Sequence, residues 1–195
     1  MIAVVFIFLI ASCQGLVDDI NDDPNSIPTE DIPQNLFLTG AQLSNISFQL
    51  GHLSRISALY SGQLFGFQSV YGDVYRYNIS TAEANSSWNK IYVGVVTNTR
   101  SMAKNAPNDN LLVGISKVLE AHALGSAASV FGDVPFYEIN NPDIDDPAFD
   151  SQVAVLGEVQ RVLDEAISSL QGKSRPLGED IHFGGDADKW IATAY

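Results

Sequence analysis

Aromatic side chains gather in one stretch of the sequence, residues 65–84, which contains glycine and has only weak periodicity. Its rings belong to Phe65, Phe67, Tyr71, Tyr75 and Tyr77. Rings in an exposed loop can stack on sugar rings, and tyrosine hydroxyls add hydrogen bonds. We therefore take Tyr71, Tyr75 and Tyr77 as candidate ligand contacts. The alternative is that each ring only pins its loop to the core.

The residue types that support catalysis do not form recognised patterns. There is no Gly-x-Ser-x-Gly, His-Glu-x-x-His or Cys-x-x-Cys sequence, and the histidines are scattered at positions 52, 122 and 182. A glycosidase needs two carboxylates about 5–10 Å apart, and 23 acidic residues would supply such a pair by chance. The sequence therefore predicts no catalytic residue, no metal ligand and no cofactor, and a secreted acidic glycoside hydrolase remains an alternative.

Composition restricts the class of partner. The 195 residues carry a formal net charge of -13, which repels nucleic acid and disfavours a polybasic grip on anionic lipid. Hydrophobic residues make up 46% and aromatic residues 10%, enough to build a folded core. At this length we expect one compact domain.

The N-terminus has the features of a targeting segment. Ile2–Ala11 is an uninterrupted apolar run, too short to cross about 30 Å of hydrocarbon but suited to a secretion signal. It leads through Ser12 into Cys13, the single cysteine, and this ending resembles the bacterial lipobox. We expect residues 1–12 to be a lipoprotein signal peptide and Cys13 to be lipidated, with an incidental cysteine as the alternative.

Residues 13–32 contain six acidic residues, two prolines and no base. Such a composition stays solvated and extended, so we predict a flexible acidic leash between the anchor and the folded domain. A calcium loop starting at Asp18 or Asp19 is disfavoured, because the required glycine is missing at the sixth position in both registers.

From residue 33 onward the periodicity is helical. Leucines recur at multiples of seven residues over residues 33–65 and, with apolar residues at the offset positions, predict an apolar stripe along a long helix. The leucines are Leu36, Leu43, Leu50 and Leu64, and the offset residues are Ile46, Leu53 and Tyr60. We expect a second helix to begin at Asn85 or Ser86 and to end before Pro107.

Three further helices follow. One is capped by Asn108 or Asp109 and is rich in small residues near its end, the next runs from Asp150 or Ser151 to Gly172, and the last is capped by Asp186 or Asp188. Residues 65–84 and 131–149 look irregular. No strand pattern appears, so the sequence predicts an all-α fold of helical hairpins, in a bundle or solenoid with long irregular loops.

The order of several short motifs resembles the SusD/RagB family of outer-membrane nutrient-binding lipoproteins. Beside the lipobox and the acidic segment, the motifs are Trp88-Asn89-Lys90-Ile91-Tyr92, Phe131-Gly132-Asp133-Val134-Pro135-Phe136, Phe149-Asp150-Ser151-Gln152 and Gly184-Gly185-Asp186-Ala187-Asp188-Lys189-Trp190. Each motif alone is weak, but their order and spacing cover nearly the whole mature chain.

The resemblance implies a TPR-like helical domain at residues 33–195, no catalysis, and surface capture of an oligosaccharide or peptide-like nutrient. It also implies delivery to a SusC-like TonB-dependent transporter in the outer membrane, to which the lipid anchor holds the protein. Family members are usually much longer, so we expect a domain truncated at its C-terminus. An interaction scaffold without a small ligand remains a second alternative.

Overall fold

The computed structural model describes residues 31–195, of which Gln34–Tyr195 form one compact unit. The predicted signal peptide, Cys13 and nearly all of the predicted leash lie outside the described residues. Over residues 31–195 no strand forms, and one isolated bridge joins Val134 to Asp150. The predicted all-α fold class is therefore confirmed.

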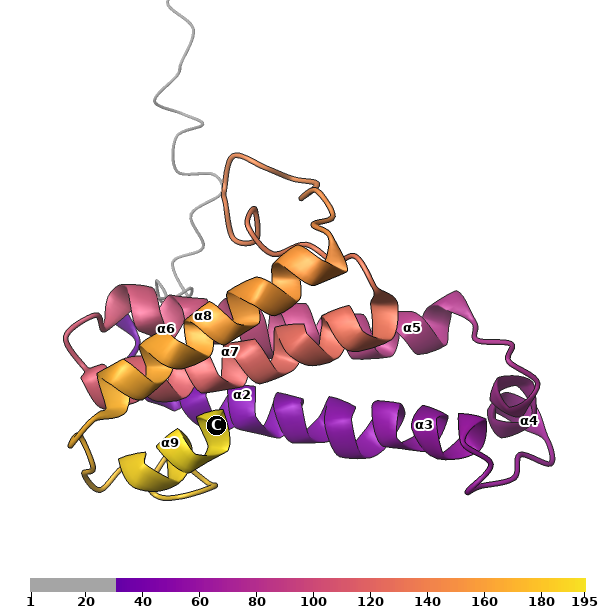
Figure 1. The fold of residues 1–195 in the computed structure, drawn as a ribbon, viewed down its shortest axis with the longest axis horizontal. Coiled ribbons are helices and arrows are strands. Elements are labelled where there is room, and N and C mark those ends of the chain that lie inside the picture. Colours follow the sequence, from indigo (N-terminus) through magenta and orange to yellow (C-terminus); the bar gives the residue numbers. More distant parts are fainter. Residues whose placement is uncertain (1–30) are drawn as a thin grey trace, which may run out of the picture. The chain divides into compact units, whose positions relative to one another are not determined.

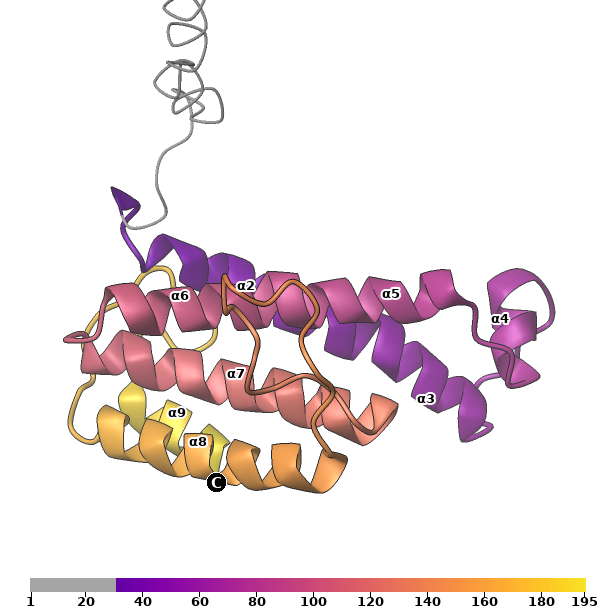
Figure 2. The ribbon, with the colours of Figure 1, turned by 90° about the horizontal axis from the view of Figure 1, so that it is seen from above.

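Two long composite helices form the first hairpin (Figures 1 and 2). The outgoing helix consists of α2 (Leu36–Ile46), the π-helical segment η3 (Ser47–Leu53) and α3 (Ser54–Tyr60). The returning helix consists of α5 (Thr81–Asn89), the π-helical segment η4 (Lys90–Val96) and α6 (Thr97–Asn105). Because α2 packs against η4 and α6 while η3 packs against α5, the two helices run antiparallel. The short helix α4 (Ser69–Tyr75) lies in the connection and packs against α3.

The second hairpin pairs α7 (Asn110–Phe131) with α8 (Gln152–Leu170). They pack tightly at Gly114, where an added Cβ would lie 2.4 Å from Leu170 Cγ. Helix α9 (Ala187–Ala194) packs against both helices of this hairpin. Residues 132–151 form the long connection above α7 and α8 in Figure 1, without a helix.

Side-chain caps set the starts of these helices. Asp109, Ser151 and Asp186 each accept a hydrogen bond from the backbone N–H three residues later, as predicted for α7, α8 and α9. The predicted start of the second helix is wrong. Ser80 caps α5, five residues earlier, and its Oγ accepts from Glu83 N at 3.3 Å. Ser80 and Glu83 have the spacing of a capping box, a local signal for this start.

The predicted apolar stripe is wrong for its leucines at heptad spacing, which face solvent, whereas its offset member Leu53 is buried and Ile46 and Tyr60 are partly buried. Leu36, Leu43 and Leu50 are 56%, 54% and 75% exposed, and Leu64 is half exposed. The buried side of the outgoing helix is mixed in polarity and consists of Leu38, Ala41, Gln42, Asn45, Phe48, His52, Leu53, Ile56 and Leu59. Polar side chains are buried there because they have hydrogen-bond partners in other parts of the fold. The leucine spacing therefore identified the opposite, solvent-facing side.

Helix α7 lies at the centre of the main core. By length and composition it could cross a membrane, but 67% of that apolar stretch is buried within the described unit. Leu112, Ile115, Leu119 and Leu124 are fully buried in it. A separate satellite core contains the buried residues Ile56, Leu59 and Val74, between α3 and α4. The unit therefore has a large core around α7 and a small core at the end that carries α4.

Candidate ligand-binding face

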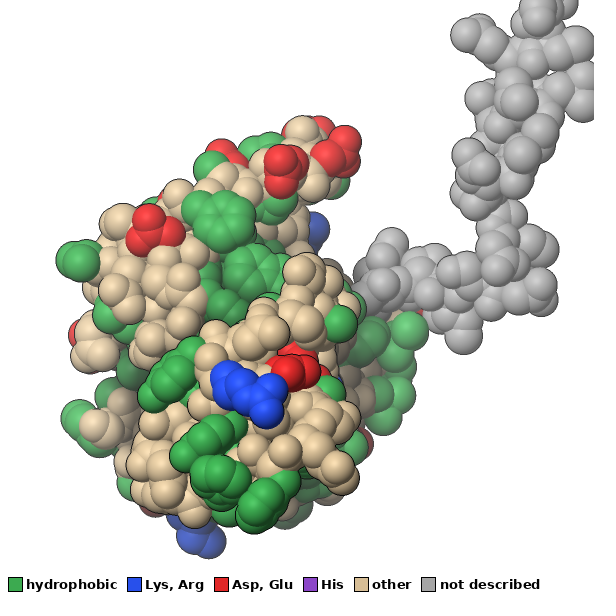
Figure 3. Space-filling model, turned by 90° about the vertical axis from the view of Figure 1, so that its right-hand side faces the viewer, with side chains coloured by type: hydrophobic (Ala, Val, Ile, Leu, Met, Phe, Trp, Pro, Cys, Tyr) green, Lys and Arg blue, Asp and Glu red, His purple; other side chains and the backbone are tan. Residues whose placement is uncertain are grey.

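The end of the unit formed by α3, α4 and the connections beside them presents a set of aromatic rings (Figures 1 and 3). We call this set the aromatic face; it comprises Tyr60, Phe65, Phe67, Tyr71, Tyr75 and Tyr77. Figure 3 shows hydrophobic side chains gathered there beside a Lys or Arg side chain, which has an Asp or Glu side chain next to it. All six rings come from one segment of 18 residues, as the sequence predicted for the region from residue 65 onward.

Ring contacts order the face. Phe65 lies 4.4 Å from Tyr75 and 4.8 Å from Phe67 between ring centroids, and Tyr60 stacks on Tyr77 at 4.8 Å. Tyr60 and Tyr75 also pack on the satellite core. Such contacts fix ring directions, because offset and edge-on aromatic pairs are favoured over free rotation.

The backbone beneath the face is tightly constrained. A Cβ at Gly66 would lie 1.9 Å from the carbonyl oxygen of Tyr71, so only glycine fits there without a shift. Tyr77 has a positive φ of 62°, a left-handed conformation that bulky residues rarely adopt. The turn is closed by hydrogen bonds from Tyr77 N to Val74 O and from Asn78 N to Asp73 O, both 2.9 Å.

The three predicted ligand contacts are placed differently. Tyr71 and Tyr77 are 49% and 72% exposed, whereas Tyr75 is only partly exposed and supports Phe65. Phe67, at 82% exposed, is the most open ring of the face. Rings this open contribute little to the core, so they are available to a ligand.

A network of polar residues from the outgoing helix and α5 contacts Tyr71 through Arg55. The Arg55 guanidinium lies over the Tyr71 ring, 5.4 Å from its centroid, and Arg55 Nη2 donates to Glu83 Oε2 at 2.8 Å. His52 Nε2 lies 2.9 Å from the same carboxylate oxygen, and His52 Nδ1 contacts Ser87 Oγ. This chain of contacts ties the outgoing helix to α5. Sequence reasoning missed it, because these partners are about 30 residues apart and have no local pattern.

The Ser87, His52 and Glu83 side chains have the residue types of a hydrolytic triad. Their burial argues against that chemistry: Ser87 is 0% exposed, so no substrate carbon can reach its hydroxyl. Burial also lowers the pKa of His52, and the hydrogen bond and charge of Glu83 offset this only in part. The cluster is best explained as a hydrogen-bonded link between helices.

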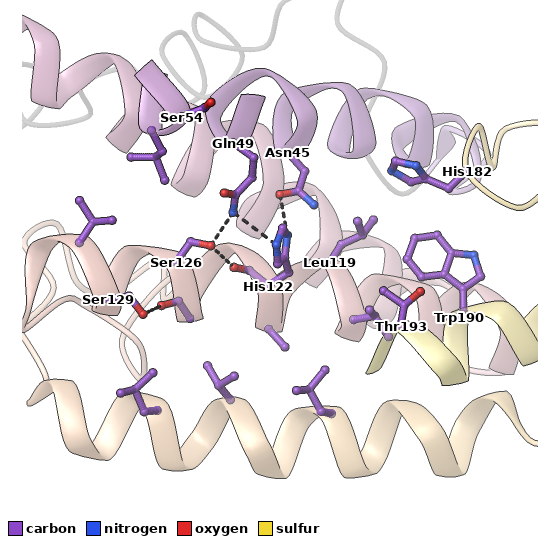
Figure 4. A pocket seen from close by; sticks show the side chains of 18 of the residues that line it. Asn45, Gln49, Ser54, Leu119, His122, Ser126, Ser129, His182, Trp190 and Thr193 are labelled. Atoms are coloured by element: carbon purple, nitrogen blue, oxygen red, sulfur yellow. Dashed lines mark hydrogen bonds between the residues drawn. The ribbon is translucent and has the colours of Figure 1, made fainter. Parts of the chain in front are cut away.

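Apart from the aromatic face, the unit has a groove between α2, η3, α3, α7, α8 and α9 (Figure 4). This groove has a volume of about 720 Å³ and mostly apolar walls, including Leu53, Leu156 and Leu163. A short polar row crosses it. In that row, His122 Nδ1 lies 3.1 Å from Asn45 Oδ1, and Gln49 Nε2 donates to Ser126 Oγ at 2.5 Å.

The groove suits an apolar occupant better than a sugar. Its tryptophan, Trp190, is 2% exposed, and the indole N–H is already donated to Asp180 at 2.8 Å. The walls are mostly apolar, and the side chains of the polar row already hydrogen-bond to one another, which leaves few free groups for the hydroxyls of a sugar. The aromatic face is therefore the better candidate for a carbohydrate site. Within residues 31–195, no group of three or more His, Cys, Asp or Glu side chains could hold a metal ion.

Stacked antiparallel helix hairpins with open rings at one end define a helical binding module. The chain belongs to the SusD-like family: residues 24–194 match the family model SusD-like_2, described as starch-binding associating with outer membrane. The sequence resemblance is thereby confirmed. No curated protein matches the chain significantly.

Solved structures share the fold. A SusD/RagB family protein from Bacteroides thetaiotaomicron superposes with a TM-score of 0.75 at 22% identity, over 84% of this chain and 36% of that one. A chitin-binding protein gives 0.71 at 21% identity, over 83% and 36%. A SusD-like protein from B. thetaiotaomicron gives 0.64 at 17%, over 86% and 36%. The predicted TPR-like fold is confirmed, and the chain spans about a third of the length of these proteins.

Proposed function

We propose that this protein captures carbohydrate at the outer membrane and presents it to a SusC-like TonB-dependent transporter. The observation that carries the proposal is the aromatic face, where open rings are held in fixed directions beside an arginine. The starch-binding description of the family and the chitin-binding neighbour both support a sugar as the nutrient, rather than a peptide. Binding through stacking and hydrogen bonds needs no catalytic group and no cofactor.

Within the face, Tyr71 and Tyr77 are the proposed stacking residues, and Tyr75 supports them through Phe65. Tyr71 is steadied by Arg55 behind it, and Tyr77 by its stack on Tyr60. A ring that is already oriented loses little conformational entropy when a sugar binds, which raises affinity. Soluble starch and chitin oligosaccharides are the first ligands to test.

The test is calorimetry of the whole chain with malto- and chito-oligosaccharides. Tyr71→Ala and Tyr77→Ala should each weaken binding of the preferred sugar about tenfold, since aromatic side chains that become buried under a ligand dominate the binding energy. Tyr195→Ala is the matched control, because Tyr195 follows α9, is 90% exposed and lies outside the face. Unchanged affinity in both face variants would reject this site.

We also propose that Cys13 carries the lipid that holds the protein at the membrane, with the acidic leash between anchor and fold. Cys13→Ala should move the protein from the membrane to the soluble fraction, because it removes the residue that carries the acyl chains, and stable anchoring needs two or more such chains. An unaltered distribution would contradict lipid anchoring at this residue.

One observation favours a different function. The exposed leucines Leu36, Leu43 and Leu50 lie along one side of the outgoing helix, as in a protein-contact surface. An interaction scaffold without a small ligand predicts no glycan binding at all, together with a partner lost on Leu43→Gln. The calorimetry above separates the two.

A further inference from the structure

The charges of this protein are unevenly distributed along its sequence. The whole chain has 10 Lys plus Arg and 23 Asp plus Glu, but residues 54–90 contain three cations and only two acids. The cations are Arg55, Arg76 and Lys90, and the acids are Asp73 and Glu83. This segment includes the whole aromatic face. At physiological ionic strength charges are screened beyond about 8 Å, so a ligand at the face responds to these local groups.

Within residues 31–195, Arg76 and Lys90 are the cations of this segment without an ion pair, and of the two only Arg76 lies in the stretch 60–77 that forms the aromatic face. Among the five arginines, all of which lie in the described part of the chain, it is the one without an ion pair. The others are paired with carboxylates: Arg55 with Glu83, Arg100 with Glu120, Arg161 with Glu158 and Glu165, and Arg175 with Asp109. In so acidic a protein, a guanidinium left without a carboxylate is available to an external anion.

Arg76 belongs to the chain segment that forms the aromatic face. It follows the last residue of α4, and its N–H donates to Asp73 O at 3.0 Å, which fixes the turn. Arg76 is exposed and stands between Tyr75 and Tyr77 in the sequence. The positive φ of Tyr77 keeps that ring on Tyr60 immediately after the arginine. Strained backbone of this kind is concentrated at ligand sites.

We propose that the aromatic face binds an anionic sugar unit, with the Arg76 guanidinium on its acidic group and the Tyr77 ring against its apolar face. This rests on the proposed carbohydrate function and specifies the class of sugar. A guanidinium presents parallel N–H donors that match the two oxygens of a carboxylate or a sulfate. Both anions share this chemistry, and either a uronic acid or a sulfated sugar supplies it.

The test compares ligands that differ only in charge. Trigalacturonate and its methyl ester have the same rings, so calorimetry of the whole chain with each isolates the contribution of the carboxylate. The acid should bind at least tenfold more tightly than the ester. Arg76→Gln should remove that difference, and Arg76→Lys should keep part of it because charge remains without the planar fork.

A sulfated galactan oligomer and its desulfated form make the second arm. In one of the two ligand pairs, Arg76→Gln should abolish the tighter binding of the charged member. That pair identifies the anion as a carboxylate or a sulfate. Lys104→Gln is the matched control, since Lys104 is an exposed cation near the end of α6, and it should change neither pair. Thermal melts confirm that the variants fold.

Charged and uncharged ligands binding equally in both arms would overturn the anionic-sugar proposal and leave carbohydrate binding intact. The same holds if Arg76→Gln weakens both members of a pair alike. Absence of binding to every glycan, including the malto- and chito-oligosaccharides, would overturn the proposed function as well.

Discussion

At the residue scale, Asp180 carries the buried charge that joins distant parts of the chain. It is 4% exposed and accepts hydrogen bonds from Gln42 Nε2, Trp190 Nε1 and Gly185 N at 2.7, 2.8 and 2.9 Å. Burial by itself raises the pKa of this carboxyl, but the hydrogen bonds from Trp190, Gly185 and Gln42 outweigh it and hold the pKa below its ordinary value. The carboxylate thus links α2 to α9.

We expect Asp180→Asn to lower the free energy of unfolding at pH 7 by about 2–4 kcal/mol, because an amide cannot accept all these hydrogen bonds. The folded pKa lies below the unfolded value of about 3.9, so the ionised carboxylate stabilises the fold above that pH. That contribution is lost as pH falls through the folded pKa. Urea unfolding from pH 7 to pH 3 should therefore show a shallower acid loss in the variant.

Asp164→Asn provides the control for this prediction, since Asp164 is exposed on α8 and its carboxylate has no ion pair within residues 31–195. It should change stability by less than about 0.5 kcal/mol. Parallel acid profiles for the native chain and Asp180→Asn would contradict the role of this carboxylate.

Whether the sequence could predict a contact depends on how far apart its two residues lie in the chain. The caps Asp109, Ser151 and Asp186 were predictable because each bonds a backbone N–H three residues away. Asp180 was not, because Gln42 is 138 residues distant. The same holds for the candidate site: the rings were visible as a local cluster, whereas the contact of Arg55 with Glu83 depends on packing between helices.

At the element scale, order and type of the long helices followed from periodicity, but the face that each helix buries did not. The outgoing helix buries Gln42, Asn45 and His52 and exposes the leucines that recur every seven residues. A π-helical segment, η3, lies within it and changes the angular phase between its two halves. Neither feature can be read from a hydrophobic repeat. Helix α4 was missed as well, because seven residues give too short a periodic pattern.

Two glycines of α7 give a matched prediction about helix packing. Gly114→Ala places a Cβ 2.4 Å from Leu170 Cγ, so the α7–α8 contact must separate, at a cost of about 1–3 kcal/mol. Gly125→Ala places its Cβ 3.6 Å from Val159 Cγ1, an ordinary contact. There the gain in helix propensity should stabilise the protein by about 0.5–1 kcal/mol.

Chemical denaturation measures the free energy of unfolding of both variants, with the denaturant dependence (m-value) of each compared with that of the native chain. Because the substitution is the same and the helix is shared, opposite signs of the stability change report only on the neighbouring helix. Equal effects at the two positions would mean that α7 and α8 are not closer at Gly114 than at Gly125.

At the scale of the whole molecule, two cores of unequal size support different parts of the compact unit. The main core extends through both hairpins around α7, whereas the satellite core has only Ile56, Leu59 and Val74 as buried members. Segments with few buried apolar contacts open locally without global unfolding. The aromatic face therefore lies on the part of the unit that is held by the smaller core.

Hydrogen exchange should separate these two levels of stability. Amides of α4 should exchange on the order of 100-fold faster than those of α7 around Ile115, through local opening. Val74→Ala should accelerate exchange in α4 alone, whereas Leu124→Ala, in the main core, should accelerate it throughout. A bound sugar should slow α4 selectively, because binding at the face stabilises only the closed form. Equal rates in α4 and α7, rising together in Val74→Ala, would instead mean one cooperative unit.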